Sequence, residues 1–288
     1  MLIAQISDCH IRDQETPVGR LVDTTKTLHL VTEHLMGLDP APDVVLATGD
    51  LTDDGTTTQY AILREILAPI DGRIVPIPGN HDEQPAFRLA FSDLLPDDLP
   101  DDHCSYVVDD HPVRIVALDT TLPGRHDGHF DHLREAWLDT ALNAAPDRPT
   151  VVFTHFPPFD TGLRFMDRAG LIEAGRLRAV IENHPQVKLL SCGHLHRPIQ
   201  TIIGTALVTT CPSTGNQLNL ALHSERADAV NEPPAYQLHW WDGGRFVTHT
   251  GVVRNPDSVR TVDLSDYATE VRRRHEAGEA HTKAPLGN

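Results

Sequence analysis

The fold of this 288-residue chain can be predicted from one repeated pattern, which is clearest in Val44-Val45-Leu46-Ala47-Thr48-Gly49-Asp50-Leu51-Thr52-Asp53. Its first five residues are apolar or β-branched, which is typical of a strand buried on both faces. A glycine and an aspartate follow at once, so a potential ligand stands where the strand ends. The same pattern occurs four more times: Leu2–Ser7 before Asp8 and His10, Arg73–Ile77 before Asn80 and His81, Val151–Thr154 before His155, and Val187–Ser191 before His194 and His196.

Amphipathic segments separate these strands and a further one, Val113–Leu118. Four of them carry apolar residues at helical spacing: Thr24–Leu38, Thr57–Leu67, His132–Leu142 and Leu171–Asn183. Alternating strands and helices predict a layered α/β fold. Open sheets of this class bind ligands at the carboxyl ends of their strands, which is where every cluster lies.

The last third of the chain has a different pattern. Ile199–Thr210 favours strands, and Tyr236–Trp241 with Arg245–Val252 favours a hairpin around Asp242-Gly243-Gly244. Ser224–Pro234 is polar and predicts a surface loop or lid. We expect a catalytic domain over residues 1–217, C-terminal strands over 218–271 that complete the sheet or form a cap, and a disordered tail over 272–288.

Composition restricts the function. With 24 basic and 41 acidic residues the formal charge is −17, which argues against a nucleic-acid polymer as partner because such binders present a basic face. The four cysteines have no metal-type spacing, and reduced thiols are expected. The first strand reaches Asp8 without a signal peptide, and no apolar stretch is long enough for a membrane span. We therefore predict a cytoplasmic protein that does not bind membranes.

Carboxylates, an amide and imidazoles together form a ligand set for divalent Zn, Mn, Fe or Co. Asp8 and His10 stand two apart, as do His194 and His196, so each pair can point to one side of an extended segment. Each residue has another explanation when it is taken singly. Asp8 could cap a turn, Asn80 could supply a left-handed turn, and His155 could be a hydrogen-bonded core histidine. Together the clusters predict a site for two metal ions.

The series Asp8-x-His10, Gly49-Asp50-x-x-Asp53, Gly79-Asn80-His81-Asp82, His155 and Gly193-His194-x-His196 resembles the calcineurin-like metallophosphoesterase superfamily, from Leu2 to about Gln217. It resembles most the bacterial class III cyclic nucleotide phosphodiesterases and the glycerophosphodiesterases. That narrower likeness rests on Ile6-Ser7-Asp8, Met166-Asp167, Gly193-His194-Leu195-His196-Arg197-Pro198, and Pro212-Ser213-Thr214 with Gln217. The resemblance implies a layered α/β/β/α sandwich of two mixed sheets flanked by helices, with a small C-terminal extension.

The resemblance also implies the ligands. One ion would be held by Asp8, His10, Asp50 and His196, and the other by Asp50, Asn80, His155 and His194, with Asp50 bridging. His81 would be the catalytic residue that contacts the phosphate and could assist the leaving oxygen. Because Asn80 is uncharged, we expect the second ion to exchange more readily. Asp82 could orient His81 and Asp53 could fix its own loop, although loop acids are often merely solvated.

The expected enzyme is a metal-dependent phosphoric diester hydrolase that attacks through a metal-activated hydroxide. We rank 3′,5′-cyclic nucleotides such as cyclic AMP first as substrates, glycerophosphodiesters second and phosphomonoesters third, mainly on the resemblance. A nuclease and a metal-free scaffold remain as alternatives. Self-association through the C-terminal portion, with Tyr236, Trp240, Trp241 and Phe246, is left open.

Two further groups of residues allow more than one interpretation. His126, His129 and His132 have metal-like spacing, but Gly128 marks a turn, and we predict that they and His223 lie on exposed loops. Phe156, Phe159, Phe165 and Met166 could stack on a substrate or simply pack their loops.

Overall fold

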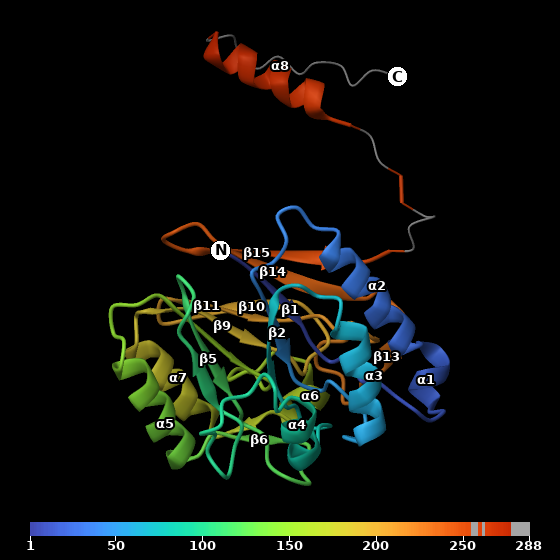
Figure 1. The fold of residues 1–288 in the computed structure, drawn as a ribbon, viewed down its shortest axis with the longest axis vertical. Coiled ribbons are helices and arrows are strands. Elements are labelled where there is room, and N and C mark those ends of the chain that lie inside the picture. Colours follow the sequence, from blue (N-terminus) through green and yellow to red (C-terminus); the bar gives the residue numbers. More distant parts are fainter. Residues whose placement is uncertain (255–258, 261–262, 278–288) are drawn as a thin grey trace. The chain divides into compact units, whose positions relative to one another are not determined.

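Two mixed β-sheets are stacked face to face in residues Met1–Val253 (Figure 1). The computed structural model describes residues 1–254, 259–260 and 263–277. In the first sheet, three parallel strands are extended at one edge by an antiparallel hairpin. Its order is β15 (Phe246–Val252), β14 (Ala235–Trp241), β1 (Leu2–Ile6), β2 (Val44–Thr48) and β3 (Arg73–Ile77).

The second sheet has four parallel strands with one antiparallel strand at each edge. Its order is β10 (Ile199–Ile203), β11 (Ala206–Thr210), β9 (Val187–Cys192), β7 (Thr150–Thr154), β5 (Arg114–Leu118) and β4 (Tyr106–Val108). Six of the parallel strands, β1, β2, β3, β5, β7 and β9, are the segments that the sequence marks as buried, and the structure confirms them to within about a residue at each end. The seventh, β11, lies within Ile199–Thr210, where we expected strands without predicting their bounds.

The side chains of β2 explain why the two sheets stack. All five of its residues are buried, and they alternate between two cores. Val44 and Leu46 pack between the sheets, whereas Val45 and Ala47 point to the helices on the outer face. A strand that is apolar on both faces therefore needs a layer on each side, and the fold provides both.

Helices cover the outer face of each sheet. On the first sheet lie α2 (Thr24–Met36), α3 (Thr57–Leu67) and α4 (Gln84–Ala90), and on the second lie α5 (His132–Asn143) and α7 (Ala174–Asn183). Figure 1 shows α2 and α3 on one side of the sheets and α5 and α7 on the other. The arrangement confirms the predicted α/β/β/α sandwich.

One predicted helix begins later than its sequence pattern indicates. Leu171–Ile172 form the short strand β8, which pairs with β6 (Gly128–His129). Glu173 follows in the left-handed conformation, with φ of 58°, so the helix can begin only at Ala174. The prediction of a helix over Leu171–Asn183 was wrong for its first residues because pairing with the loop before α5 outweighs the helical pattern.

The C-terminal hairpin belongs to the first sheet. β14 pairs with β1 and carries the predicted hairpin partner β15. Of the aromatic residues considered for self-association, Tyr236 and Phe246 are buried, while Trp240 is 49% exposed. Within the segment 224–234, Ala229–Val230 form the short strand β13, which pairs with β12 (Gln217–Leu218).

The second unit of the chain, from Arg254, contains helix α8 (Ser265–Glu276). This helix includes residues 272–276 of the segment for which we predicted a disordered tail, and residues 278–288 lie outside the described residues. Four further short helices or strands in the described part of the chain were not predicted from the sequence: α1 (Pro17–Leu21), α4, β4 and α6 (Arg164–Arg168).

The core between the sheets allows a direct test. We expect Leu46→Ala to lower the free energy of unfolding by about 2–5 kcal/mol, because the side chain is fully buried in that core. Urea denaturation followed by circular dichroism measures the change. The matched control is Leu133→Ala on α5, where the side chain is 54% exposed and alanine suits the helix. Equal losses in the two variants would contradict this account of the core.

Candidate metal centre

Five loops meet at the carboxyl ends of parallel strands from both sheets. Asp8 and His10 follow β1, Asp50 follows β2, and Asn80 follows β3. From the second sheet, His155 follows β7, and His194 and His196 follow β9. Main-chain hydrogen bonds hold the first two loops together, from Asp8 N to Gly49 O at 3.0 Å and from His10 N to Asp50 O at 2.9 Å.

The backbone turns sharply at most of these residues. Five of them have φ between 45° and 69°, in the left-handed region: Asp8, His10, Asp50, His194 and His196. Each such conformation costs a non-glycine residue about 1–3 kcal/mol, and it persists only where surrounding contacts enforce it. Strained residues of this kind concentrate at functional sites.

Two glycines permit the close approach of the loops. A Cβ at Gly49 would lie 2.5 Å from Nδ1 of His155, and a Cβ at Gly79 would lie 2.2 Å from Oδ1 of Asp50. Any larger residue at either position would push a candidate ligand aside. The glycines that precede Asp50 and Asn80 are therefore a packing requirement of the site.

The side chains gather into two buried groups that share one neighbour. Asp8, His10 and His196 form the first group, and Asp50, His155 and His194 form the second; within each, the ligand atoms lie within 4.8 Å of one another. Oδ2 of Asp50 lies 3.7 Å from Nε2 of His10 and 3.4 Å from Nε2 of His155, so this carboxylate faces both groups. Oδ1 of Asn80 lies 3.2 Å from Nε2 of His155 and joins the second group.

The hydrogen bonds of the histidines fit cation binding. Nδ1 of His10 lies 2.9 Å from an Asp53 carboxylate oxygen, that of His155 is 2.9 Å from the Thr48 carbonyl, and that of His196 is 2.7 Å from the Asn216 carbonyl. Oxygen can only accept in these bonds, so Nδ1 carries a proton in each histidine and Nε2 is the nitrogen that faces the centre. Nε2 of His194 is buried without a hydrogen-bond partner among the described residues. A bound cation would satisfy this unpartnered buried nitrogen, beside imidazoles whose Nε2 atoms face the same centre.

Burial and charge set the protonation states. Burial lowers the pKa of His194 to about 3 and that of His196 to about 4, so both are neutral, as ligation requires. Burial would raise the pKa of Asp50, but His155, His81 and His10 hold it well below its usual value. Asp50 in turn raises the pKa of His155 to about 9 although burial acts in the opposite direction. The buried carboxylate therefore makes the centre favourable for positive charge.

Asp53 supports two site residues at once. Its carboxylate binds Nδ1 of His10 and accepts two hydrogen bonds from Arg12, at 2.9 and 2.8 Å. Its main-chain carbonyl accepts a hydrogen bond of 2.9 Å from Nδ1 of His81, and the main-chain N–H of His81 donates to Asp50 at 2.8 Å. Asp53 thus fixes the orientation of a candidate ligand and of the candidate catalytic residue.

We considered that Asp82 could orient His81, but in the structure Asp82 has a different role. Its carboxylate accepts hydrogen bonds from the main-chain N–H groups of Leu51, Thr52 and Gly79 and from the hydroxyl of Tyr60. These bonds join the loop after β2 to the loop after β3. Asp53, through its carbonyl, orients His81 instead.

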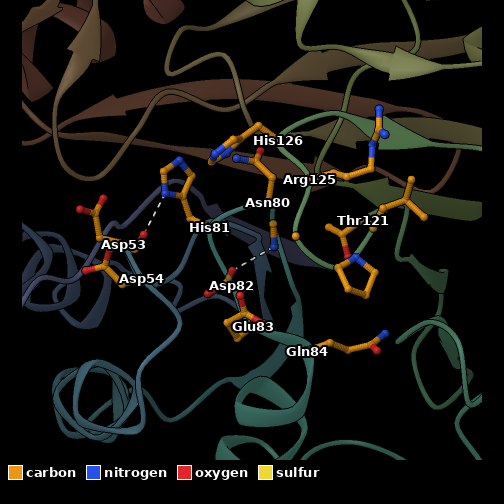
Figure 2. Close-up of a pocket in the computed structure, with 14 residues that line it drawn as sticks. Asp53, Asp54, Asn80, His81, Asp82, Glu83, Gln84, Thr121, Arg125 and His126 are labelled. Carbon is orange, nitrogen blue, oxygen red and sulfur yellow. Dashed lines mark hydrogen bonds between the residues drawn. The ribbon is translucent and has the colours of Figure 1, made fainter.

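Two cavities adjoin at this centre and share Asp53, Asn80 and His81 in their walls. The metal-side cavity, of about 470 Å³, contains candidate ligands and apolar residues that include Val18, Phe165, Met166 and Leu218. The other, of about 290 Å³, is lined by Glu83, Gln84 and the segment Thr121–His126, and we call it the His126 cavity. Figure 2 shows Asn80, His81 and His126 side by side in its wall.

Comparison with known proteins identifies the family. Residues 1–198 match the calcineurin-like phosphoesterase family. The chain belongs to this family. It is 35% identical over 257 residues to a probable glycerophosphodiester phosphodiesterase, GpdQ, of Arcobacter nitrofigilis, covering 88% of this chain and 93% of that protein. It is 30% identical over 266 residues to the 3′,5′-cyclic adenosine monophosphate phosphodiesterase CpdA of Pseudomonas aeruginosa, covering 91% of this chain and 93% of that protein.

Solved structures share the fold of this phosphoesterase. A dimetal phosphatase from Danio rerio has a TM-score of 0.63 at 14% identity, covering 88% of this chain and 96% of that one. At this identity the likeness concerns the fold alone. Family membership and the two buried Asp/His groups together support a centre of two divalent metal ions. Among the helices that the structure describes, none has the length and hydropathy needed to cross a membrane.

Of the four apolar loop residues that we considered as substrate contacts, two line a cavity and two pack in the protein interior. Phe165 and Met166 line the metal-side cavity, whereas Phe156 is fully buried and Phe159 packs against the core of the second sheet. The prediction that four histidines lie on exposed loops was wrong for two of them: His129 lies half-buried in β6 and pairs with Glu173 at 2.9 Å, and His132 is the first residue of α5. His223 is exposed, and none of these three lines either cavity. His126 is exposed too, yet it lies beside His81, which the spacing of the three histidines does not reveal.

Arg12 and Asn216 are site residues that sequence reasoning missed. Arg12 stands two residues after His10, and that spacing places it beside the same loop. Asn216 acts through its main-chain carbonyl, and no side-chain pattern can signal such a contact.

Asp53→Asn is expected to weaken the binding of one Mn²⁺ ion about 10- to 100-fold, because the amide removes the charge that holds His10 and Arg12. Equilibrium dialysis of metal-stripped protein measures both affinities. Asp71→Asn, on an exposed loop, is the matched control and should bind as the parent does. A variant that binds both ions with unchanged affinity would show that Asp53 does not support the centre.

Proposed function

We propose that this chain hydrolyses small phosphodiesters at a centre of two divalent metal ions. The observation that supports this most strongly is the pair of buried Asp/His groups that face Asp50. Asp8, His10, Asp50 and His196 would hold one ion, and Asp50, Asn80, His155 and His194 the other. The donor set of carboxylate, amide and imidazole suits Fe, Mn, Zn or Co. Two bound cations would lower the pKa of water and neutralise charge on the phosphoryl oxygens.

The surrounding residues orient the reacting groups. His81 is fixed at its main-chain N–H by Asp50 and at Nδ1 by the Asp53 carbonyl, so its Nε2 remains to contact a phosphoryl oxygen. The buried position of Asp50 and His155 excludes water from one side of the centre, and substrate enters from the two cavities. No Ser or Cys is among the described residues that line these two cavities. The proposed reaction needs no protein nucleophile, because the attacking group is water.

The two adjoining cavities favour an acyclic diester. A phosphodiester carries two arms on one phosphorus, and an acyclic substrate can place one arm in each cavity beside His81. In a cyclic nucleotide both ester oxygens belong to one ribose, so one cavity would stay without an arm. Glycerophosphodiesters therefore become our first candidate substrates, in line with the likeness to the probable glycerophosphodiester phosphodiesterase of Arcobacter nitrofigilis. Cyclic AMP, ranked first from the sequence, is the second candidate and has support from the likeness to CpdA.

The test is kcat/KM for glycerophosphocholine, cyclic AMP and bis(p-nitrophenyl) phosphate, on metal-stripped protein and after reloading with Mn²⁺. We expect activity on diesters only after reloading, with glycerophosphocholine preferred over cyclic AMP, and a large loss in Asn80→Ala. Faster hydrolysis of cyclic AMP would reverse the order of the candidates. Silence on all three substrates with two ions bound would overturn the proposed reaction.

A further inference from the structure

The segment between β5 and β6 brings a second imidazole to the candidate site. The ring centroids of His126 and His81 lie 5.6 Å apart with 53° between their planes. Both residues line the His126 cavity, and Figure 2 shows the His126 ring near His81. The cavity wall thus has two imidazoles from different loops at the place where the two cavities join.

Contacts within this segment hold its shape. The main-chain N–H of Arg125 donates to the carbonyl of Leu122 at 3.1 Å, around Gly124 with φ of 72°. Two nitrogens of the Arg125 guanidinium bind the two carboxylate oxygens of Asp127, each at 2.6 Å. The neighbours of His126, Arg125 and Asp127, are therefore paired with each other. Their charged groups are occupied by this pairing, so His126 is the residue of the three that we consider as a contact for substrate.

The end of the segment packs against the metal centre. A Cβ at Gly128 would lie 2.4 Å from the ring of Phe156, so the backbone here touches that ring. The Phe156 ring in turn lies 5.0 Å from the ring of His155 and 4.6 Å from that of His194. Gly128 follows His126 by two residues, so the position of His126 is tied to the candidate ligands through Phe156.

The imidazoles of His81 and His126 differ in their hydrogen-bond partners. Nδ1 of His81 is committed to the Asp53 carbonyl. In contrast, His126 makes no hydrogen bond or ion pair within the part of the chain that the structure describes. A polar side chain at a cavity wall with no partner of its own is free to bind a polar atom of a ligand.

We infer that His126 donates a hydrogen bond to the departing ester oxygen of an acyclic phosphodiester, and so determines how well alkyl arms leave. This rests on the proposed diesterase function. The bond from phosphorus to the arm breaks with its electron pair on the oxygen, while the oxygen of water forms the new bond to phosphorus. One water proton finally resides on the departing alcohol. The hydrogen bond from His126 stabilises the charge that develops on this oxygen.

The nature of the leaving group distinguishes a hydrogen bond to the departing oxygen from a contact to a phosphoryl oxygen, which is the contact proposed for His81. An alkoxide concentrates negative charge on its oxygen, whereas p-nitrophenolate spreads the charge over its ring and needs little help. Loss of His126 should therefore harm hydrolysis of alkyl diesters far more than hydrolysis of nitrophenyl diesters. Loss of a contact to the phosphoryl oxygens would harm both alike.

The experiment compares parent, His126→Ala and His126→Gln on glycerophosphocholine and bis(p-nitrophenyl) phosphate, each loaded with Mn²⁺. We expect kcat/KM on glycerophosphocholine to fall about 10- to 100-fold in His126→Ala, with partial recovery in His126→Gln, and the nitrophenyl diester to change less than about threefold. The matched control is His132→Ala, an exposed histidine outside both cavities. Bound Mn²⁺, measured by elemental analysis, should be equal in all four proteins.

The outcomes distinguish the inference from the function on which it rests. A parent protein that hydrolyses neither diester means that the proposed function fails. An active parent with equal losses on both substrates, or no loss in His126→Ala, overturns the role of His126. Loss of bound Mn²⁺ in His126→Ala would also overturn it, because the segment would then act by holding the metal ligands.

Discussion

Asp50→Asn is expected to lower kcat/KM on bis(p-nitrophenyl) phosphate at least about a thousandfold and to leave at most one Mn²⁺ ion bound per chain. The carboxylate faces both groups of candidate ligands and accepts the main-chain N–H of His81. Asparagine keeps the size of the side chain but removes its charge, and with it the attraction that the centre has for cations.

The measurement combines steady-state kinetics with elemental analysis of dialysed protein. Asp147→Asn is the matched control, because Asp147 is exposed and outside both cavities. Circular dichroism should show that the variant is folded, because Asp50 is not one of the apolar residues that form the core of the first sheet. Retention of two ions together with near-normal activity would remove Asp50 from its proposed bridging position.

His81→Ala should reduce kcat on the same substrate about 10²- to 10³-fold while both ions stay bound. The reason is that the imidazole is proposed to contact the substrate and not the metal, with its orientation set by Asp50 and Asp53. His29→Ala, on the exposed side of α2, is the matched control.

The metal content of the His81→Ala variant shows whether His81 contacts the substrate or is itself a metal ligand. His10, Asp53 and His81 also lie close enough together to hold an ion. If His81 were a ligand, its replacement would release Mn²⁺ and the loss of kcat would follow the loss of metal. Full metal occupancy with low kcat is the result that our assignment requires.

Much of this site was predictable because ligands and strands occur in a fixed order. Each candidate ligand follows a buried strand, and parallel strands bring their carboxyl ends to one edge. The structure brings Asp8, His10, Asp50, Asn80, His155, His194 and His196 into contact through those strand ends. The alternation of Val44 to Ala47 between two cores likewise follows from the apolar character of β2.

Other features depend on contacts that no local pattern contains. The left-handed φ of His10 and Asp50 is imposed by the meeting of loops, since the residue types alone disfavour it. The pairing of β8 with β6 is a contact between distant segments, and it shortened the predicted helix after Leu171. The position of His126 depends on Gly128 packing against Phe156, which sequence spacing does not reveal. A cytoplasmic location and self-association through the C-terminal portion stay predictions.

We propose that two metal ions bound by these loops make the chain a phosphodiesterase. The most direct test is a titration of metal-stripped protein with Mn²⁺, in which bound ions and hydrolysis of bis(p-nitrophenyl) phosphate are measured on the same samples. We predict two ions per chain at saturation, with activity that rises as the second ion binds. Full activity in the metal-stripped protein, or saturation at a single ion per chain, would contradict the account.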